Sequence, residues 1–200
     1  MSSPASKESA DTKTRILDAA WRLLEADAGV GKGVRVGDIA REAGISRQAV
    51  YLHFPTRAEL LVAATRHVDA VKDVDARLAG SRAATGAEKL DAFIEAWGGY
   101  IPEIYGVARA LLAMRESDEA AAEAWRDRMR AVMHGCAAAV RELEEADLLR
   151  PDLPSDDASD ILWTLLSVRN WEHLRHDCGW SQEHYIDGMK RLARRALLAD

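Results

Sequence analysis

The chain has 200 residues, of which 48% are hydrophobic and 30% are charged, and a formal net charge of −6. This length and apolar content suit one or two compact domains with a sizeable core. No stretch approaches the roughly 18 apolar residues of a membrane span, and the first ten residues lack the apolar segment of a signal peptide. Two cysteines do not make a disulfide framework, so we expect a cytoplasmic protein.

The charge is unevenly distributed along the chain. Residues 1–60 hold nine Lys or Arg against eight Asp or Glu, whereas residues 61–200 hold 18 against 25. The net charge argues against a nucleic-acid binder that is basic throughout. A weakly basic segment on an acidic body instead suits a protein that presents one end to phosphate.

Helical periodicity runs through almost the whole first half, without the alternation of β-branched residues that indicates strands. Residues 1–10 are predicted to form a disordered tail. The helices that follow are predicted over about 12–25, 36–43, 47–53 and 56–78. A glycine-rich segment over 28–33 has neither the preceding strand nor the Lys-Ser/Thr ending of a phosphate-binding loop. Thr56 and Glu59 form a capping box at the start of the fourth helix.

The second half is also predicted to be helical. Its helices are expected over about 90–101, 104–114, 118–146, 157–176 and 181–197. Pro102 is expected to end or kink the first of these, because proline lacks an N–H and clashes with the preceding turn. A second capping box is predicted at Thr85 and Glu88. The helix over 157–176 is apolar on nearly all faces, which indicates that most of its faces are covered.

The segment from Val36 to Pro55 has the features of a helix-turn-helix. Gly44 lies where the turn requires a positive φ, which glycine adopts without steric cost. Ser46 is a suitable N-cap for the second helix. Ile39 and Val50 are expected to face the core. A helical hairpin inside an ordinary bundle is the alternative, because this pattern by itself is not specific.

The polar side chains of this segment suit DNA. Arg47, Gln48, Tyr51 and His53 are predicted to point outward from the second helix. Arg can pair with guanine O6/N7 and Gln with adenine N6/N7, while Tyr and His can donate to phosphates. Arg35 and Arg57 lie at the starts of two further helices, whose N–H groups also favour phosphate.

These residues resemble the DNA-binding domain of the TetR family over about 12–62. The resemblance is carried by three groups of residues: Thr14, Arg15, Leu17, Ala19 and Ala20; Asp38, Ile39, Ala40, Glu42, Ala43, Gly44, Ile45 and Ser46; and Val50, Tyr51, His53, Phe54, Arg57, Glu59, Leu60 and Leu61. It implies an all-α, nine-helix fold. A three-helix DNA-binding head would occupy residues 11–55, and a ligand-binding and dimerisation body residues 56–200.

The resemblance also implies roles for individual residues. Ser46, Arg47, Gln48, Tyr51 and His53 would lie on the recognition helix, with Tyr51 and His53 on phosphates. Arg57 stands where the family commonly has a lysine that anchors the fourth helix to the DNA backbone. Two positions depart from the family pattern. Arg35 replaces a phosphate-binding threonine, and Gly37 replaces a better helix former at a cost of about 1 kcal/mol.

The body is expected to form a homodimer and to hold a small-molecule effector. DNA half-sites about 34 Å apart require two heads related by a two-fold axis, and the family resemblance places that interface on the helices over 157–176 and 181–197. A monomer with 157–176 as its central helix is the alternative. Candidate residues for a largely apolar or aromatic effector are His67, Trp97, Tyr100, Tyr105, Met129, Met133, Trp163 and Asn170. Each also suits ordinary core packing.

Together these features predict a repressor that binds a palindromic operator as a homodimer and is released by its effector. Three other functions are alternatives to it. Glu172, His173, His176 and Cys178 could hold a metal, although histidines at a helix C-terminus also favour the helix dipole. An enzyme is disfavoured, because no nucleophile elbow, Walker sequence or zincin motif is present. A regulator controlled by a protein partner without an effector is the third. We expect no cofactor and no membrane partner.

Overall fold

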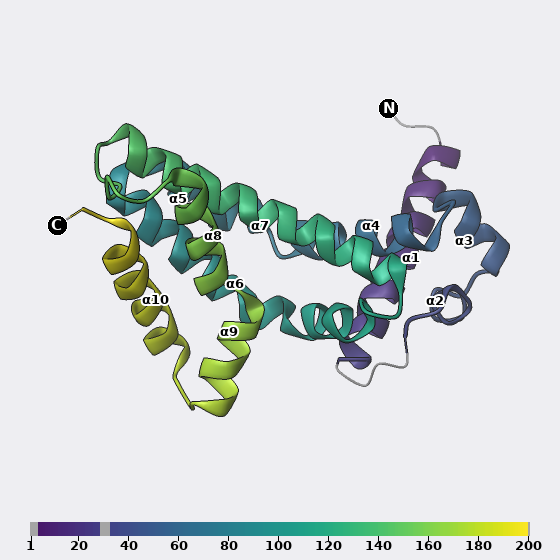
Figure 1. Cartoon of the computed structure of the whole chain (residues 1–200). Helices are drawn as coiled ribbons and strands as arrows, with labels where there is room; N and C mark the ends of the chain where they lie inside the picture. Colours follow the sequence, from purple (N-terminus) through teal and green to yellow (C-terminus); the bar gives the residue numbers. More distant parts are fainter. Residues whose placement is uncertain (1–3, 29–32, 200) are drawn as a thin grey trace. The chain divides into compact units, whose positions relative to one another are not determined.

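The structure is a computed structural model that describes residues 4–28 and 33–199. Within that part the chain folds as helices α1 to α10 and one π-helical turn, η1 (Figure 1). The predicted all-α fold is therefore confirmed. None of the helices in these ranges combines the length and the apolar character needed to cross a membrane. The first three residues of the predicted tail and most of the predicted glycine-rich segment lie outside the described residues.

The first four helices agree with the sequence except at the N-terminus. They are α1 (Pro4–Ala26), α2 (Val36–Glu42), α3 (Arg47–His53) and α4 (Arg57–Val71). Because α1 begins at Pro4, the prediction of a tail is wrong from that residue onward. The predicted cap of α4 is confirmed, since the Thr56 side chain accepts a hydrogen bond from the Glu59 N–H at 3.1 Å.

The helix predicted over 56–78 is two helices. Asp73 interrupts it with a left-handed backbone (φ 52°), and its carboxylate accepts a hydrogen bond from the N–H of Ala76 at 3.4 Å. Aspartate tolerates this conformation and is a favoured N-cap. A second helix, α5 (Val74–Ala83), therefore starts immediately after α4 ends.

The two helices predicted on either side of Pro102 are one continuous helix, α6 (Gly86–Met114). Pro102 has no N–H to donate to the carbonyl of Gly98, four residues earlier. That carbonyl instead accepts a hydrogen bond of 2.7 Å from the side-chain amide of Gln182. A residue 84 positions away thus replaces the bond that proline removes, and the expected break does not occur.

Helix α7 (Glu119–Glu145) agrees with prediction, but the helix predicted over 157–176 is broken. It consists of α8 (Ser155–Leu165), α9 (Val168–Glu172) and η1 (His173–Asp177). Ser167 starts α9 by accepting from the N–H of Asn170 at 3.2 Å, and the Asn170 amide donates to the Thr164 carbonyl at 2.6 Å. With α8, α9 and η1 counted as one broken helix, the described chain has the nine helices expected, ending in α10 (Gln182–Leu197).

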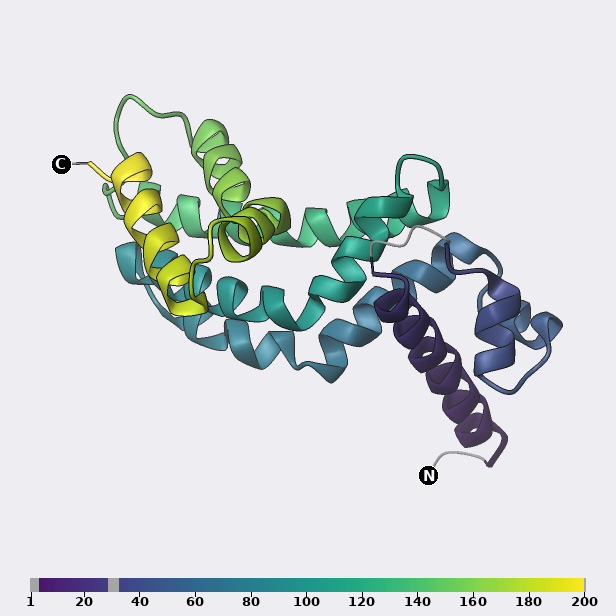
Figure 2. The same cartoon turned by 90° about the horizontal axis from the view of Figure 1, so that it is seen from below.

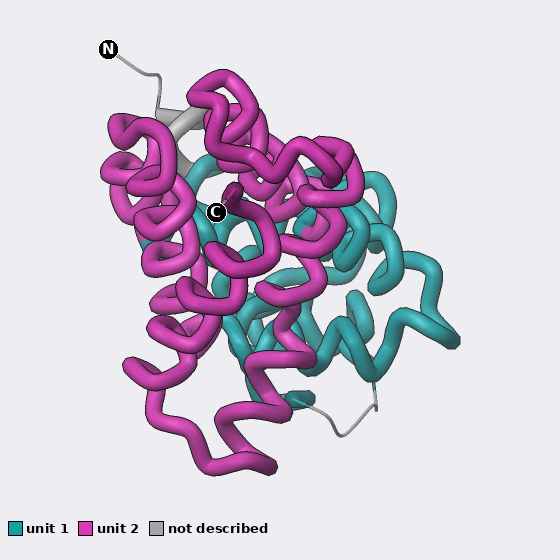
Figure 3. The backbone as a smooth tube through the Cα atoms, turned by 60° about the vertical axis from the view of Figure 1, so that its left-hand side comes forward, with its two compact units in different colours: residues 1–72, 104–128 teal, residues 73–103, 129–200 magenta. Residues whose placement is uncertain are grey.

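The chain divides into two compact units (Figure 3). Unit 1 comprises Met1–Lys72 and Ile104–Arg128, and unit 2 comprises Asp73–Glu103 and Met129–Asp200. Unit 1 therefore takes in more than the head predicted over 11–55, because α4, the end of α6 and the start of α7 share its core. The side chains of that core that are completely buried include Ile16, Leu24, Ile39, Leu61 and Ala110.

Unit 2 has its own core, in which α10 packs against α8 (Figure 2). Close approaches need small residues here. A Cβ atom on Gly135 of α7 would lie 2.5 Å from the Phe93 ring of α6. A Cβ atom on Gly188 of α10 would lie 2.6 Å from the Trp180 ring. A larger side chain at Gly135 would displace the Phe93 ring between α7 and α6, and one at Gly188 would displace the Trp180 ring of the segment before α10.

We expect Gln182→Ala to lower the free energy of unfolding by about 1–3 kcal/mol, because the buried carbonyl of Gly98 loses its donor and the indole N–H of Trp171 loses its acceptor. Adding Pro102→Ala restores a backbone N–H that can donate to the same carbonyl. The double variant should therefore recover part of the loss, as measured by urea denaturation. If the two substitutions only added their separate costs, the proposed exchange of donors at Gly98 would be wrong.

Candidate nucleic-acid interface

The α2–turn–α3 segment has the geometry expected of a helix-turn-helix. Gly44 has a φ of +67° in the turn. Ser46 caps α3 by accepting from the Ala49 N–H at 3.1 Å. Ile39 and Val50 are 0% and 1% exposed, so they hold the two helices on the core of unit 1. The local predictions for these four residues are confirmed.

The exposed face of α3 consists of two neighbouring rows of side chains. Arg47 and Tyr51 form the first, one helical turn apart; the Arg47 guanidinium donates to the Tyr51 hydroxyl at 3.5 Å and lies 5.8 Å from the ring centroid. Gln48 and Leu52 form the second row. The Leu52 side chain is 81% exposed. Leu52 was not among the residues predicted to point outward, although it lies one helical turn after Gln48, which was.

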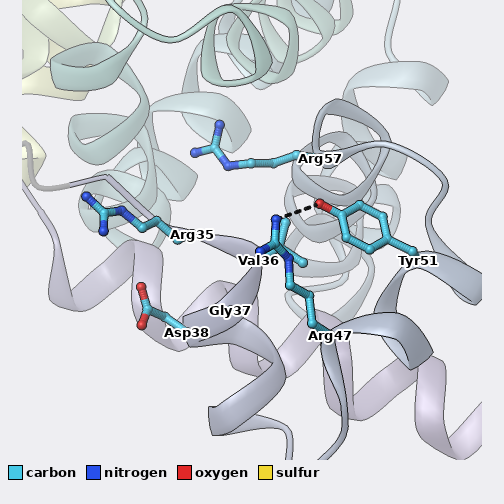
Figure 4. Close-up of a pocket in the computed structure, with 7 residues that line it drawn as sticks. All are labelled: Arg35, Val36, Gly37, Asp38, Arg47, Tyr51 and Arg57. Carbon is cyan, nitrogen blue, oxygen red and sulfur yellow. Dashed lines mark hydrogen bonds between the residues drawn. The ribbon is translucent and has the colours of Figure 1, made fainter.

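A hollow of about 330 Å³ lies beside the first row. Its described lining comes from the start of α2, from α3 and from the start of α4, as Figure 4 shows: Arg35, Val36, Gly37, Asp38, Arg47, Tyr51 and Arg57. Three of these side chains are arginines. The single carboxylate among them, Asp38, is paired with Arg41 on the same helix. The lining is therefore cationic, which suits a phosphate.

Arg57 differs from the other two arginines because it is engaged within the protein. Its Nε donates to the Val34 carbonyl at 2.9 Å, and its terminal nitrogen lies 2.6 Å from an oxygen of Asp118. The side chain is 24% exposed. The sequence predicted a phosphate anchor at this position. The structure gives Arg57 a structural role, since it joins the start of α4 to the segment before α2 and to the start of α7.

Asp118 completes this joint. Its carboxylate also accepts from the N–H groups of Ala120 and Ala121 at 3.1 and 3.2 Å, so it caps α7. Partial burial acts to raise the pKa of Asp118, but the hydrogen bonds from Arg57 and from these two backbone groups outweigh it and lower the pKa. The carboxylate is therefore held in its charged form.

The remaining residues predicted to contact DNA are on α3. Gln48 is exposed, and His53, at the end of the helix, is half-buried. The Ser46 hydroxyl is occupied by its capping bond. Arg35 is exposed and precedes α2 as its N-cap residue. The structure thus brings Arg35, Arg47, Tyr51 and Arg57 around one hollow, while Gln48 lies on the neighbouring row.

Two of the predicted effector residues belong to unit 1. His67 lies on α4, where its Nε2 is 2.7 Å from a carboxylate oxygen of Asp18 on α1 and its ring meets the edge of Trp21. The side chain of His67 is 15% exposed. It therefore has a polar partner within unit 1 and is partly exposed. Tyr105, on α6, is half-buried.

The other six predicted effector residues lie in unit 2. Trp97 and Tyr100 are buried next to each other, with ring centroids 6.1 Å apart. The Trp97 indole N–H donates to the Leu166 carbonyl at 2.9 Å, so its polar atom is already used in the fold. Asn170 is used in the break between α8 and α9. Met129, Met133 and Trp163 are half-buried.

The arrangement of the predicted metal-binding residues does not support a metal site. Among the described residues, no group of three His, Cys, Asp or Glu side chains is placed to hold an ion. His173 bonds Asp177 at 2.9 Å through Nδ1 and lies 3.8 Å from the Cys178 sulfur through Nε2. His176 meets the Trp171 ring edge to face instead.

An all-α chain that presents a helix-turn-helix beside a cluster of arginines has the architecture of a DNA-binding transcription regulator. The family of bacterial regulatory proteins named after TetR matches residues 16–64, from α1 to α4. Residues 16–64 are therefore similar to the DNA-binding domain of the TetR family, whose members are DNA-binding transcription factors. Cys136 of α7 is 0% exposed, and burial raises the pKa of its thiol to about 12.

One curated relative matches part of the chain, and two solved structures share its fold. The transcriptional repressor LfrR of Mycolicibacterium smegmatis is 43% identical over 70 residues, which is 34% of this chain and 35% of that protein. A transcriptional regulator from Saccharomonospora viridis, solved in complex with choline, has a TM-score of 0.71 at 22% identity, over 96% of this chain and 100% of that chain. NalD from Pseudomonas aeruginosa, a repressor of a multidrug efflux pump, has a TM-score of 0.65 at 22% identity, over 96% and 98%. These two structures show a shared fold.

We expect Asp118→Asn to destabilise the protein by about 1–2 kcal/mol at pH 7, because the amide can still cap α7 but cannot pair with the charge of Arg57. The pKa of Asp118 is lower in the folded chain, so its contribution is present above about pH 4 and is lost as the pH falls through the folded-state value. The difference from the wild type in thermal denaturation should therefore narrow below pH 4.

Glu119→Gln is the matched control, since the neighbouring carboxylate of Glu119 is 82% exposed and pairs with Arg126 at the surface. It should change stability little at any pH. A pH-independent loss in Asp118→Asn would show that the charge on Asp118 is not what holds the joint.

Proposed function

We propose that the protein is a transcriptional repressor that binds a palindromic operator as a homodimer and is released by a small, largely apolar or aromatic effector. The observation that carries the proposal is the exposed face of α3 beside the arginine-lined hollow. Such an arrangement suits a helix in the major groove whose flanking cations hold the phosphates. A repressor of this kind acts in the cytoplasm, where the bacterial DNA is.

The two rows of α3 suggest a division of roles. Arg47 and Tyr51 share their hollow with Arg35, so this row is assigned to the DNA backbone, together with His53 at the end of the helix. The sequence predicted that Arg47 pairs with guanine. Because Arg47 lies over the Tyr51 ring and beside a second arginine, we assign it to a phosphate instead. Gln48, on the other row, is assigned to adenine.

Two exposed apolar side chains of unit 2 support a homodimer through α8 and α10. Ile161 on α8 is 36% exposed and Leu192 on α10 is 44% exposed, although these two helices pack against each other. Covering both side chains with a second copy of the same helices would form a four-helix interface. The dimer would then present two α3 helices to two half-sites.

The proposal of a small-molecule effector rests on the resemblance to the TetR family and on two similar structures. The Saccharomonospora viridis regulator was solved with choline, and NalD represses a multidrug efflux pump. In this chain the half-buried Met129, Met133 and Trp163, all in unit 2, supply the adaptable apolar surface that suits such a ligand. The alternative is control by a protein partner. Screening small apolar and cationic compounds for release of the operator complex separates the two, since a partner-controlled regulator would respond to none.

Arg35→Ala and Arg47→Ala should each weaken binding to the selected operator and to unrelated DNA by similar factors. Each should also lower the slope of log affinity against log salt by about one, because each removes one phosphate contact. Fluorescence anisotropy at several salt concentrations measures both quantities. Arg126→Ala is the matched control, since Arg126 is an exposed arginine of α7 outside the hollow. An unchanged slope in the first two variants would contradict the assignment to phosphate.

Ile161→Glu should convert the dimer to a monomer, because a carboxylate would be buried against its own copy across the two-fold axis. Sedimentation velocity measures the change, and operator affinity should fall with it. Val71→Glu is the control, since Val71 is an equally apolar residue of α4, 54% exposed. If Ile161→Glu still sedimented as a dimer, the interface would have to lie elsewhere.

A further inference from the structure

We propose that Leu52 recognises the C5-methyl group of a thymine in the major groove, next to the adenine assigned to Gln48. This inference rests on the proposed DNA-binding function and adds one position of the operator sequence to it. Each half-site would then contain a thymine that is selected by an apolar contact, in addition to an adenine selected by hydrogen bonds.

The starting observation is that Leu52 is exposed without contributing to the fold. Its side chain is 81% exposed on α3, while Val50, two residues earlier, is 1% exposed and holds the helix on the core. A leucine in this position adds apolar surface to water and gains no packing. Removing it should therefore leave the fold intact, and in the free protein its side chain is open to contact with an apolar group of a bound partner.

The position of Leu52 relative to the arginines indicates where that group lies. Successive residues of an α-helix are about 100° apart, so the row of Gln48 and Leu52 faces a different direction from the row of Arg47 and Tyr51. Only the latter row lines the cationic hollow. When Arg47 and Tyr51 lie against the DNA backbone, the adjacent row turns toward the edges of the bases.

The chemistry of the base edges leaves one match for a leucine. In the major groove the bases present hydrogen-bond donors and acceptors, and thymine alone among the four adds a methyl group. Against any other edge, Leu52 would cover polar atoms without satisfying them. The cationic surroundings, with Arg35 and Arg47 on the neighbouring surface, favour DNA over an apolar protein partner as the occupant.

The spacing also agrees with two neighbouring contacts. Gln48 and Leu52 are four residues apart, which is about 6 Å along the helix axis at 1.5 Å per residue. Base pairs are stacked about 3.4 Å apart. The thymine should therefore lie within about two base pairs of the adenine in the same half-site.

Selective removal of the methyl group tests the inference. The operator is first selected from random duplexes with the wild-type protein, and each thymine of a half-site is then replaced by deoxyuridine, which lacks only the methyl. We expect one replacement near the adenine to weaken wild-type binding about fourfold per half-site, the effect of losing one buried methyl-sized contact. Leu52→Ala should bind the unmodified operator more weakly by at least that factor and should not respond to the replacement.

Two controls accompany the variant. Val71→Ala shortens another exposed aliphatic side chain, outside α3, and should respond to deoxyuridine as the wild type does. Gln48→Ala should lose the preference for adenine but keep the response to deoxyuridine. Leu52→Ala should also keep the wild-type melting temperature and the wild-type salt slope, because neither the fold nor the phosphate contacts involve Leu52.

Three results would overturn the inference. The first is that Leu52→Ala responds to deoxyuridine as the wild type does, which would mean that another residue contacts the methyl group. The second is that no replacement weakens binding of the wild type, which would mean that no methyl group is recognised. A change in sedimentation of Leu52→Ala would instead show that Leu52 contacts a second copy of the chain. Failure of the wild type to select any operator is a different outcome, because it would contradict the proposed DNA-binding function itself.

Discussion

One arginine side chain, that of Arg57, joins the helices around the cationic hollow. Through two hydrogen bonds, Arg57 ties the first turn of α4 to the carbonyl of Val34 and to Asp118 at the start of α7. Val34 directly precedes Arg35 and α2, so this joint sets where the cationic hollow begins. The Asp118 carboxylate is itself held by the backbone N–H groups of Ala120 and Ala121. The position of Arg57 is therefore tied to the first turn of α7.

Further polar contacts hold α4 along the rest of its length within unit 1. Arg66 binds the nearly buried carboxylate of Asp127 through two nitrogens, and His67 pairs with Asp18 of α1. Partial burial opposes the charge of Asp127, but bonds from Arg66 and Arg128 outweigh it and lower the pKa of that carboxyl. The helix-turn-helix, α4 and the start of α7 are thus bound together within unit 1.

The cationic hollow lies in a part of the chain that has little net charge. The first 60 residues are nearly neutral, so bulk attraction to DNA contributes little. One of the three arginines of the hollow is largely used inside the protein. Under the proposed function, affinity would then depend on a small number of specific contacts, which a dimer would double, and the exposed Leu52 of α3 would add sequence preference.

The sequence alone determined the features that depend on interactions between neighbouring residues. Gly44, Ser46, Ile39 and Val50 act through local backbone conformation, capping and helical periodicity, which are visible in neighbouring residues. The all-α fold and the family resemblance follow from the same local patterns.

Only the tertiary structure decided the features that depend on distant residues. Beside Pro102 in α6, the free carbonyl of Gly98 is bonded by Gln182, 84 positions away, and Arg57 is paired with Asp118, 61 positions away. No local pattern contains such a pairing, because which donor reaches which acceptor depends on how the helices pack.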